Sequence, residues 1–180
     1  MGSLPKTELT PETEPEFNAF ITTFAEELAC NADTLLTDAY SLRERKADWA
    51  ALVTRDPKPF DSRSRVGHKL LDHHMPHFWD VTNAKGVCVA DLACDAAAVR
   101  KALLLNTQMH STPYKSEIRR TLVLSGGLAS VTKYRAGLSK YLVKTYGATR
   151  VLDPCIGWGG RMLGTLAAGA TYIGCEPDPK

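Results

Sequence analysis

Hydrophobic residues near the start of the chain recur at the spacing of one helical face. They are separated by one to four positions and are Phe17, Phe20, Ile21, Phe24 and Leu28. This pattern predicts an amphipathic helix. A second helix is predicted from about Asp33, a residue type suited to a helix N-cap. Its inward positions are expected to be Leu35, Leu36, Ala39 and Leu42, and the two helices are expected to pack antiparallel.

The middle of the chain alternates loops with helical patterns. Residues 55–67 contain two prolines and a glycine and predict a loop. Two further helices are expected, one capped by Asp95 and one ended by Gly126 and Gly127. Their apolar positions are Val99, Leu103 and Leu104 in the first helix and Ile118, Leu122 and Val123 in the second.

A helix over residues 133–146 is predicted directly before a glycine-rich segment. Its apolar side is expected to hold Tyr134, Leu138, Tyr141 and Leu142. Gly147 is suited to the left-handed conformation that stops a helix.

Residues 150–180 change to a pattern of strand, turn, helix and strand. A short apolar strand at 150–153 ends at Pro154, a glycine-rich turn follows, and a helix is expected at 161–168. Gly169 stops this helix, and a second strand at 171–175 leads to Glu176. The sequence therefore predicts an α/β fold, in which the start of a parallel β-α-β sheet follows a mainly helical N-terminal region.

The glycine turn and the acid after the second strand favour a nucleotide-like ligand. Glycine at 157 and 159 permits a positive φ and a close approach of the ligand to the backbone. Gly160 opens a helix whose free amides favour an anionic group. Glu176 follows Asp153 by 23 positions, close to the separation of about 20 residues at which nucleotide-binding units place a ribose-binding acid.

A dinucleotide is the disfavoured ligand of this turn. Its site requires a third glycine three positions after the second one, where a pyrophosphate meets the helix. Counted from Gly157, that glycine would stand at 162, and the residue there is Met162.

The segment that begins at Asp153, Asp-Pro-Cys-Ile-Gly-Trp-Gly-Gly, resembles motif I of class I S-adenosylmethionine (SAM) dependent methyltransferases. The likeness is greatest to the amino-methyltransferases of DNA, including phage and bacterial modification enzymes, and to some that act on RNA. The resemblance implies a Rossmann-like SAM-binding sheet, with the glycine turn against the homocysteine part of SAM and Glu176 on its ribose. The residues assigned to the cofactor are Asp153, Pro154, Cys155, Gly157, Trp158, Gly159, Gly160, Glu176 and, from the preceding helix, Tyr134.

Some of these positions carry more specific expectations. Asp153 is expected to hold the turn and the ammonium end of the cofactor. Cys155 stands where the family commonly has Phe, which reduces packing on the adenine side. Trp158 is expected either to cover the cofactor or to pack on the following helix, and Tyr134 also fits the apolar face of its own helix.

The chain is accordingly divided into three parts. Residues 1–16 are expected to be a disordered leader, residues 17–130 a mainly helical region, and residues 131–180 the N-terminal part of a SAM-binding methyltransferase domain. Because a parallel sheet of this kind needs further strands to cover both faces, the sequence predicts a truncated domain.

The catalytic residues stay unassigned. Amino-methyltransferases that act on bases use an Asp/Asn/Ser-Pro-Pro-Tyr/Phe motif, and the chain does not contain one. The nearest string is Ser111-Thr-Pro-Tyr114, with Thr112 in place of the first proline, and it is interpreted as a turn.

The distribution of charge adds a possible nucleic-acid partner. The formal net charge is only +2, but residues 1–50 carry 10 acidic and 4 basic side chains, while residues 101–150 carry 1 acidic and 9 basic ones. The basic residues assigned to nucleic acid are Arg119, Arg120, Lys133 and Lys140. The alternative is that these charges line a solvated helix face.

Other features narrow the class of protein. The five cysteines are scattered, with no Cys-x-x-Cys pair, which predicts a reducing, cytoplasmic compartment without a structural zinc site. His73 and His77 have the spacing of helical metal ligands, but Pro76 lies between them, so no metal is predicted. The chain has no apolar run of the length that a membrane span requires.

The function predicted from these features is SAM-dependent methylation of an exocyclic amine of DNA, at N6 of adenine or N4 of cytosine. The fragment alone is expected to be inactive. Two alternatives stay open: an RNA methyltransferase, and a non-catalytic module that binds DNA or protein and keeps a vestigial cofactor site.

Overall fold

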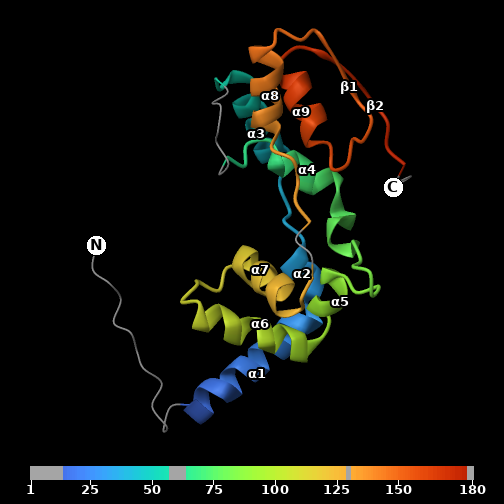
Figure 1. Ribbon diagram of the computed structural model, residues 1–180. Helices are drawn as coiled ribbons and strands as arrows, with labels where there is room; N and C mark the ends of the chain where they lie inside the picture. Colours follow the sequence, from blue (N-terminus) through green and yellow to red (C-terminus); the bar gives the residue numbers. More distant parts are fainter. Residues whose placement is uncertain (1–13, 57–63, 129–130, 178–180) are drawn as a thin grey trace. The chain divides into compact units, whose positions relative to one another are not determined.

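The computed structural model describes residues 14–56, 64–128 and 131–177, and these fall into two compact units (Figure 1). The first unit holds residues 14–37 and 79–128, and the second holds residues 38–78 and 131–177. The predicted division at residue 130 coincides with one unit boundary. The sequence did not indicate that residues 38–78 pack with the C-terminal segment.

In its described residues, the first unit contains helices and loops but no strand. Its helices are α1 (Glu14–Cys30), α2 (Ala32–Leu36), α5 (Val89–Ala93), α6 (Ala96–Gln108) and α7 (Lys115–Ser125). Residues 14–16 of the predicted leader form the first turn of α1, and the rest of the leader lies outside the described residues. The core is apolar and comprises Ile21, Ala25, Ala32, Leu35, Leu36, Val89, Ala93, Val99, Ala102, Leu103, Ile118 and Leu122.

Local capping explains the start of α6 and the end of α7. Asp95 accepts a hydrogen bond from the amide of Ala97 at 2.9 Å, so it caps α6 as predicted. Gly127, which follows α7, has a φ of +62°. The predicted helix at 17–28 and the two predicted helices around Val99 and Leu122 are therefore confirmed.

The predicted second helix is wrong in its extent. It ends at Leu36, and the separate helix α3 (Leu42–Thr54) begins after Ser41. A capping box starts α3, because the Ser41 hydroxyl accepts from the amide of Glu44 and the Glu44 carboxylate accepts from the amide of Ser41. Leu42, predicted to face inward, is 57% exposed.

The second unit combines helices with a small parallel sheet. It contains α3, α4 (His68–His74), α8 (Ala136–Thr145), β1 (Arg150–Asp153), α9 (Gly160–Ala167) and β2 (Thr171–Gly174). The short 3-10 helix η1 (Pro76–Asp80) begins in this unit. β1 and β2 pair in parallel, with Arg150 opposite Thr171 and Asp153 opposite Gly174. The predicted order of strand, helix and strand is confirmed, and a mainly helical chain with a two-stranded parallel sheet is compatible with the α/β class.

Helix α8 buries a different face from the predicted one. Its buried residues are Ala136, Ser139, Lys140 and Val143, whereas Leu142, predicted to be inside, is 39% exposed. The correction has a physical cause, because the neighbour of α8 is the backbone of α9. A Cβ at Gly164 would collide with the carbonyl of Ala136, so only small residues fit where the two helices touch.

In the described residues, no helix combines the length and the apolar character that crossing a membrane requires.

Candidate functional site

The glycine turn between β1 and α9 has the backbone conformation that the sequence predicts. Gly157 and Gly159 have φ angles of +56° and +75°, in the left-handed region that favours glycine. A Cβ at Gly157 would meet no atom within 4 Å, whereas a Cβ at Gly159 would lie 3.5 Å from a methyl of Leu71. The backbone of Gly157 therefore faces open space, and that of Gly159 faces the interior.

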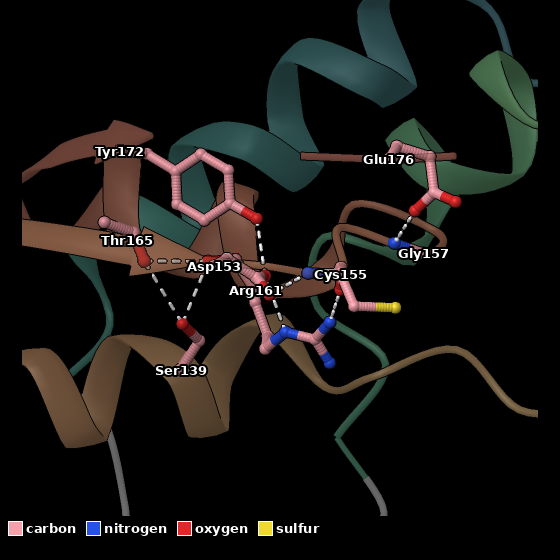
Figure 2. Close-up of polar contacts among 8 residues, drawn as sticks. All are labelled: Ser139, Asp153, Cys155, Gly157, Arg161, Thr165, Tyr172 and Glu176. Atoms are coloured by element: carbon pink, nitrogen blue, oxygen red, sulfur yellow. Dashed lines mark hydrogen bonds and ion pairs between the residues drawn. The ribbon is translucent and has the colours of Figure 1, made fainter. Parts of the chain in front are cut away.

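The turn is tied to the end of β2 by three hydrogen bonds. The amide of Cys175 donates to the carbonyl of Asp153, and the amide of Ile156 donates to the carbonyl of Cys175, both at 3.0 Å. The amide of Gly157 donates to Oε2 of Glu176 at 2.6 Å (Figure 2). The acid predicted to accompany the glycine turn therefore lies against it.

Asp153 is the centre of a buried polar network below the turn (Figure 2). The residue is 6% exposed. Its carboxylate accepts from Nε of Arg161 at 2.7 Å, from the Tyr172 hydroxyl at 2.6 Å and from the amide of Cys155 at 3.1 Å. Burial alone would raise the pKa of Asp153, but the hydrogen bonds from these three groups outweigh it and hold the pKa below its ordinary value.

Arg161 links this network to the segment before α8. Its Nη2 donates to the carbonyl of Cys155, and its guanidinium carbon lies 5.3 Å from the centre of the Tyr134 ring. The hydrogen bond to Asp153 raises the pKa of Arg161 against the opposing effect of burial. Tyr134, assigned to the cofactor from the sequence, has this cation–π contact in the structure.

Sequence reasoning missed Arg161 and Tyr172. Tyr172 pairs with Val151 in the sheet register, so it lies on the same face as Asp153. The alternation of side chains along a strand could have predicted that Tyr172 lies on this face, once parallel pairing of the two strands was assumed. Burial and the hydrogen bond to Asp153 both raise the pKa of Tyr172, so its hydroxyl stays protonated and acts as a donor.

Gly160 has a packing role at the start of α9. A Cβ there would collide with the carbonyl of Tyr134, so α9 approaches this segment backbone to backbone. Further along α9, two of its residues contact Ser139 of α8. The Ser139 hydroxyl donates to the carbonyl of Arg161 at 2.9 Å and lies 3.4 Å from the Thr165 hydroxyl (Figure 2). These contacts fix α9 relative to α8.

Trp158 projects from the turn into an aromatic group. Its ring centre lies 4.9 Å from that of Phe78 and 5.3 Å from that of His77. Lys133 Nζ lies 4.1 Å from the centre of the Phe78 ring and 2.5 Å from a carboxylate oxygen of Asp72. The described ring contacts of Trp158 are thus with residues of η1.

Two of the four residues assigned to nucleic acid are buried, which corrects that prediction. Arg119 is 8% exposed and its guanidinium carbon lies 5.4 Å from the centre of the Trp79 ring. Lys140 is 4% exposed, and its ammonium donates to the carbonyls of Leu52, Val53 and Arg55 at 2.9, 2.8 and 2.6 Å. Both charges contribute to packing within their own units, because Lys140 satisfies backbone carbonyls at the end of α3 and Arg119 covers the Trp79 ring.

The other two basic residues have acidic partners. Arg120 forms an ion pair with Glu117 at 2.8 Å, and its side chain is 44% exposed. The Lys133 side chain, paired with Asp72, is 8% exposed. The four residues also fall in two different units, with Arg119 and Arg120 in the first and Lys133 and Lys140 in the second.

The remaining predicted positions are accounted for as follows. Pro154 and Cys155 are exposed at the end of β1. The string at 111–114 lies outside helix and strand and precedes α7, in agreement with its interpretation as a turn. Within residues 14–56, 64–128 and 131–177, no group of three or more His, Cys, Asp or Glu side chains is arranged to hold a metal ion.

Comparison of the chain with protein-family models, with curated proteins and with solved structures finds no match in any of the three.

Proposed function

We propose that residues 131–177 form the cofactor half-site of a Rossmann-like, SAM-dependent amino-methyltransferase. The observation that carries the proposal is the junction of the glycine turn with Glu176 at the ends of two parallel strands. Ligands of open parallel sheets bind at the carboxyl ends of the strands, where a turn of this kind leads into a helix. The motif that begins at Asp153 specifies SAM among the nucleotide-like ligands by its resemblance to motif I.

The residues of the turn fit this cofactor. The open space beside Gly157 leaves its backbone accessible to a ligand, and a side chain there would fill that space. Glu176 supplies a carboxylate that can accept hydrogen bonds from ribose hydroxyls. When bound, SAM supplies an activated methyl group, and the chain's own residues bind and orient it.

Asp153 takes part in a different way from the one first expected. Its carboxylate oxygens already accept from Arg161, Tyr172 and Cys155, and the residue is buried. We therefore assign Asp153 to holding the turn in shape and not to contacting the ammonium end of the cofactor.

The proposed substrate is an exocyclic amine of a base in DNA, with RNA as the alternative. This part of the proposal rests on the resemblance of the motif to amino-methyltransferases. The basic residues lend it less support than the sequence suggested, because Arg119 and Lys140 are internal. The proposed enzyme acts in the cytoplasm, and its catalytic residues are not identified.

The cofactor assignment is tested by calorimetric titration of SAM and of NAD into the 180-residue chain and two valine variants. Gly157→Val introduces a β-branched side chain at a positive φ where the ligand is proposed to bind. Gly147→Val is the matched control, because Gly147 has a φ of +61° and equally open space around a Cβ, but lies at the end of α8.

We expect the wild type to bind SAM and not NAD. Gly157→Val should weaken SAM binding by about ten- to hundredfold, because the strained valine displaces the backbone that contacts the ligand. Gly147→Val should carry a similar backbone strain and leave SAM affinity unchanged. Preference for NAD, or equal SAM affinity of the two variants, would contradict the assignment. Circular dichroism of both variants checks that they remain folded.

A further inference from the structure

Two histidines at the end of α4 take no part in the candidate site. His73 and His74 are exposed in the last turn of that helix, and their rings meet edge to face with centres 4.9 Å apart. His77, which has metal-ligand spacing from His73, lies in η1 beside Trp158. The two histidines with this spacing therefore do not share one helix, and the chemistry of His73 must be sought with other neighbours.

Helix α3 lies beside α4 and supplies a cation close to these histidines (Figure 1). Asp48 of α3 joins the two helices, because its carboxylate accepts from two amides at the start of α4, both at 3.0 Å. Loss of part of its water shell, followed by the positive charges of Arg45 and His74, lowers the pKa of His73. The positive field that disfavours a proton on His73 is one that attracts an anion.

Arg45 carries a hydrogen-bond donor without an acceptor. Its Nε is covered from solvent and has no hydrogen-bond partner in the described residues. An unsatisfied donor on a charged group is costly, so it indicates an acceptor from outside the described chain. The residue as a whole is only partly buried, so its long side chain can turn the guanidinium toward a ligand at the surface.

The acidic residues of the two helices do not supply that acceptor. All of them have other partners, and they are Glu44, Asp48 and Asp72. The charge of Arg45 is therefore left for an anion that the two helices do not themselves provide.

A phosphodiester is the anion that best fits these groups. A guanidinium donates two parallel hydrogen bonds to phosphate oxygens, and a neutral imidazole donates one more. The pKa of His73 lies below its ordinary value of 6.5, so at pH 7 the imidazole is mainly neutral and Arg45 supplies the charge. One positive charge matches the single negative charge of a diester, whereas a phosphate monoester carries about −1.5 to −2 at this pH.

We propose that Arg45 and His73 bind a phosphodiester of a nucleic-acid backbone. The site lies on α3 and α4, outside the motif that begins at Asp153. The inference rests on the proposed function for the choice of nucleic acid as the partner, and it names a contact that the buried Lys140 does not provide. Such a contact orients the nucleic acid without reading its bases.

The test is fluorescence anisotropy of a short labelled DNA duplex, titrated with the 180-residue chain at several salt concentrations. The variants are Arg45→Gln, Arg45→Lys and His73→Gln, of which the lysine keeps the charge and loses the planar pair of donors. Arg43→Gln is the matched control, because Arg43 is exposed on α3 about 200° around the helix from Arg45. Calorimetric titrations of inorganic phosphate and of SAM into the wild type accompany these measurements, and circular dichroism checks the fold of each variant.

We expect Arg45→Gln to weaken duplex binding about tenfold, and to lower the slope of log affinity against log salt by about 0.9, the value of one phosphate contact. Arg45→Lys should keep the slope and lose part of the affinity. His73→Gln should weaken binding by about fivefold at an unchanged slope, because the imidazole contributes a neutral donor. Arg43→Gln should change neither quantity, and inorganic phosphate should bind more weakly than the duplex.

The outcomes separate this site from the cofactor proposal. An unchanged slope in Arg45→Gln, or an equal loss in Arg43→Gln, overturns the site, since general positive charge would then explain binding. Binding of inorganic phosphate without binding of the duplex overturns the nucleic-acid assignment. A chain that binds SAM but not the duplex refutes the phosphate site alone, whereas duplex binding that depends on Arg45 without SAM binding supports the site and refutes the cofactor proposal.

Discussion

The first unit buries a cluster of twelve hydrophobic residues, whereas the corresponding cluster in the second unit, which carries the glycine turn, has three: Leu52, Ala136 and Ala167. Outside that cluster the second unit also buries Leu71, Val143 and Ala170. Its buried polar residues are Ser139, Lys140, Asp153 and Thr165, and those of the first unit are Asn106, Arg119 and Thr121. Apolar contacts are non-directional and tolerate small shifts, while hydrogen bonds require particular distances and angles. Directional hydrogen bonds around Asp153 and the glycine turn thus fix the geometry of the candidate site.

These hydrogen bonds suit the proposed role of the second unit. A ligand-binding turn must be held in one conformation before the ligand arrives, since ordering it on binding would cost affinity. The bonds from Arg161, Tyr172 and Cys155 to Asp153 hold the end of β1, and the bond from Gly157 to Glu176 holds the turn. The first unit also holds a turn by hydrogen bonds, from the amides of Lys85 and Val87 to Oδ1 of Asn83 at 2.8 and 3.1 Å, but the acceptor there is a neutral carboxamide.

The largest expected effect concerns the apolar core of the first unit. Leu122, on α7, is 0% exposed in the core of the first unit. Replacing it with alanine should lower the free energy of unfolding by about 2–5 kcal/mol, because buried methyl groups are lost and a cavity remains. Urea titration followed by circular dichroism measures the change.

Leu124→Ala provides the control on the same helix. Leu124 is 53% exposed, so its truncation should change the unfolding free energy by less than about 0.5 kcal/mol. Similar losses in the two variants would mean that the core of the first unit is not packed as described.

A smaller loss of unfolding free energy is expected when a buried polar contact of the second unit is removed. Lys140→Met keeps an apolar stem of similar length and removes the donor to the carbonyls of Leu52, Val53 and Arg55. Buried acceptors without a donor cost about 1–3 kcal/mol, and the same urea titration should show a loss in that range. Lys144→Met, at an exposed position of the same helix, should be nearly neutral. A neutral or stabilising Lys140→Met would show that apolar packing can replace the ammonium there.

The two units also differ in how far the sequence predicts them. Helix periodicity identifies α1, α6 and α7 because apolar residues recur on their buried faces, and Asp95 and Gly127 mark the start of α6 and the end of α7. The break between Leu36 and Leu42 was missed. Apolar spacing continues across that break, and the capping box at Ser41 competes with it locally.

In the second unit, local sequence patterns predict the glycine turn but not the contacts elsewhere in the unit that stabilise it. The glycines, β1, β2 and Glu176 follow from turn chemistry and strand patterns over a short stretch of chain. The burial of Lys140 follows from carbonyls at the end of α3, more than 80 residues away in the sequence. Because a charged side chain is normally exposed, no local pattern reveals such a partner.

The last expected effect concerns the pH dependence of stability in the second unit. Burial, followed by the nearby charge of Arg135, lowers the pKa of His68 from 6.5 to about 4, while Asp72 acts in the opposite direction. The unfolded chain therefore binds a proton on His68 at a higher pH than the folded chain does. This contribution to stability is fully present above pH 6.5 and is lost as the pH falls from 6.5 to about 4. Urea titrations across that window should show a smaller slope of unfolding free energy against pH for His68→Gln than for the wild type. His74→Gln, at an exposed position of α4, should keep the wild-type slope, and an unchanged slope in His68→Gln would show that the imidazole titrates alike in both states.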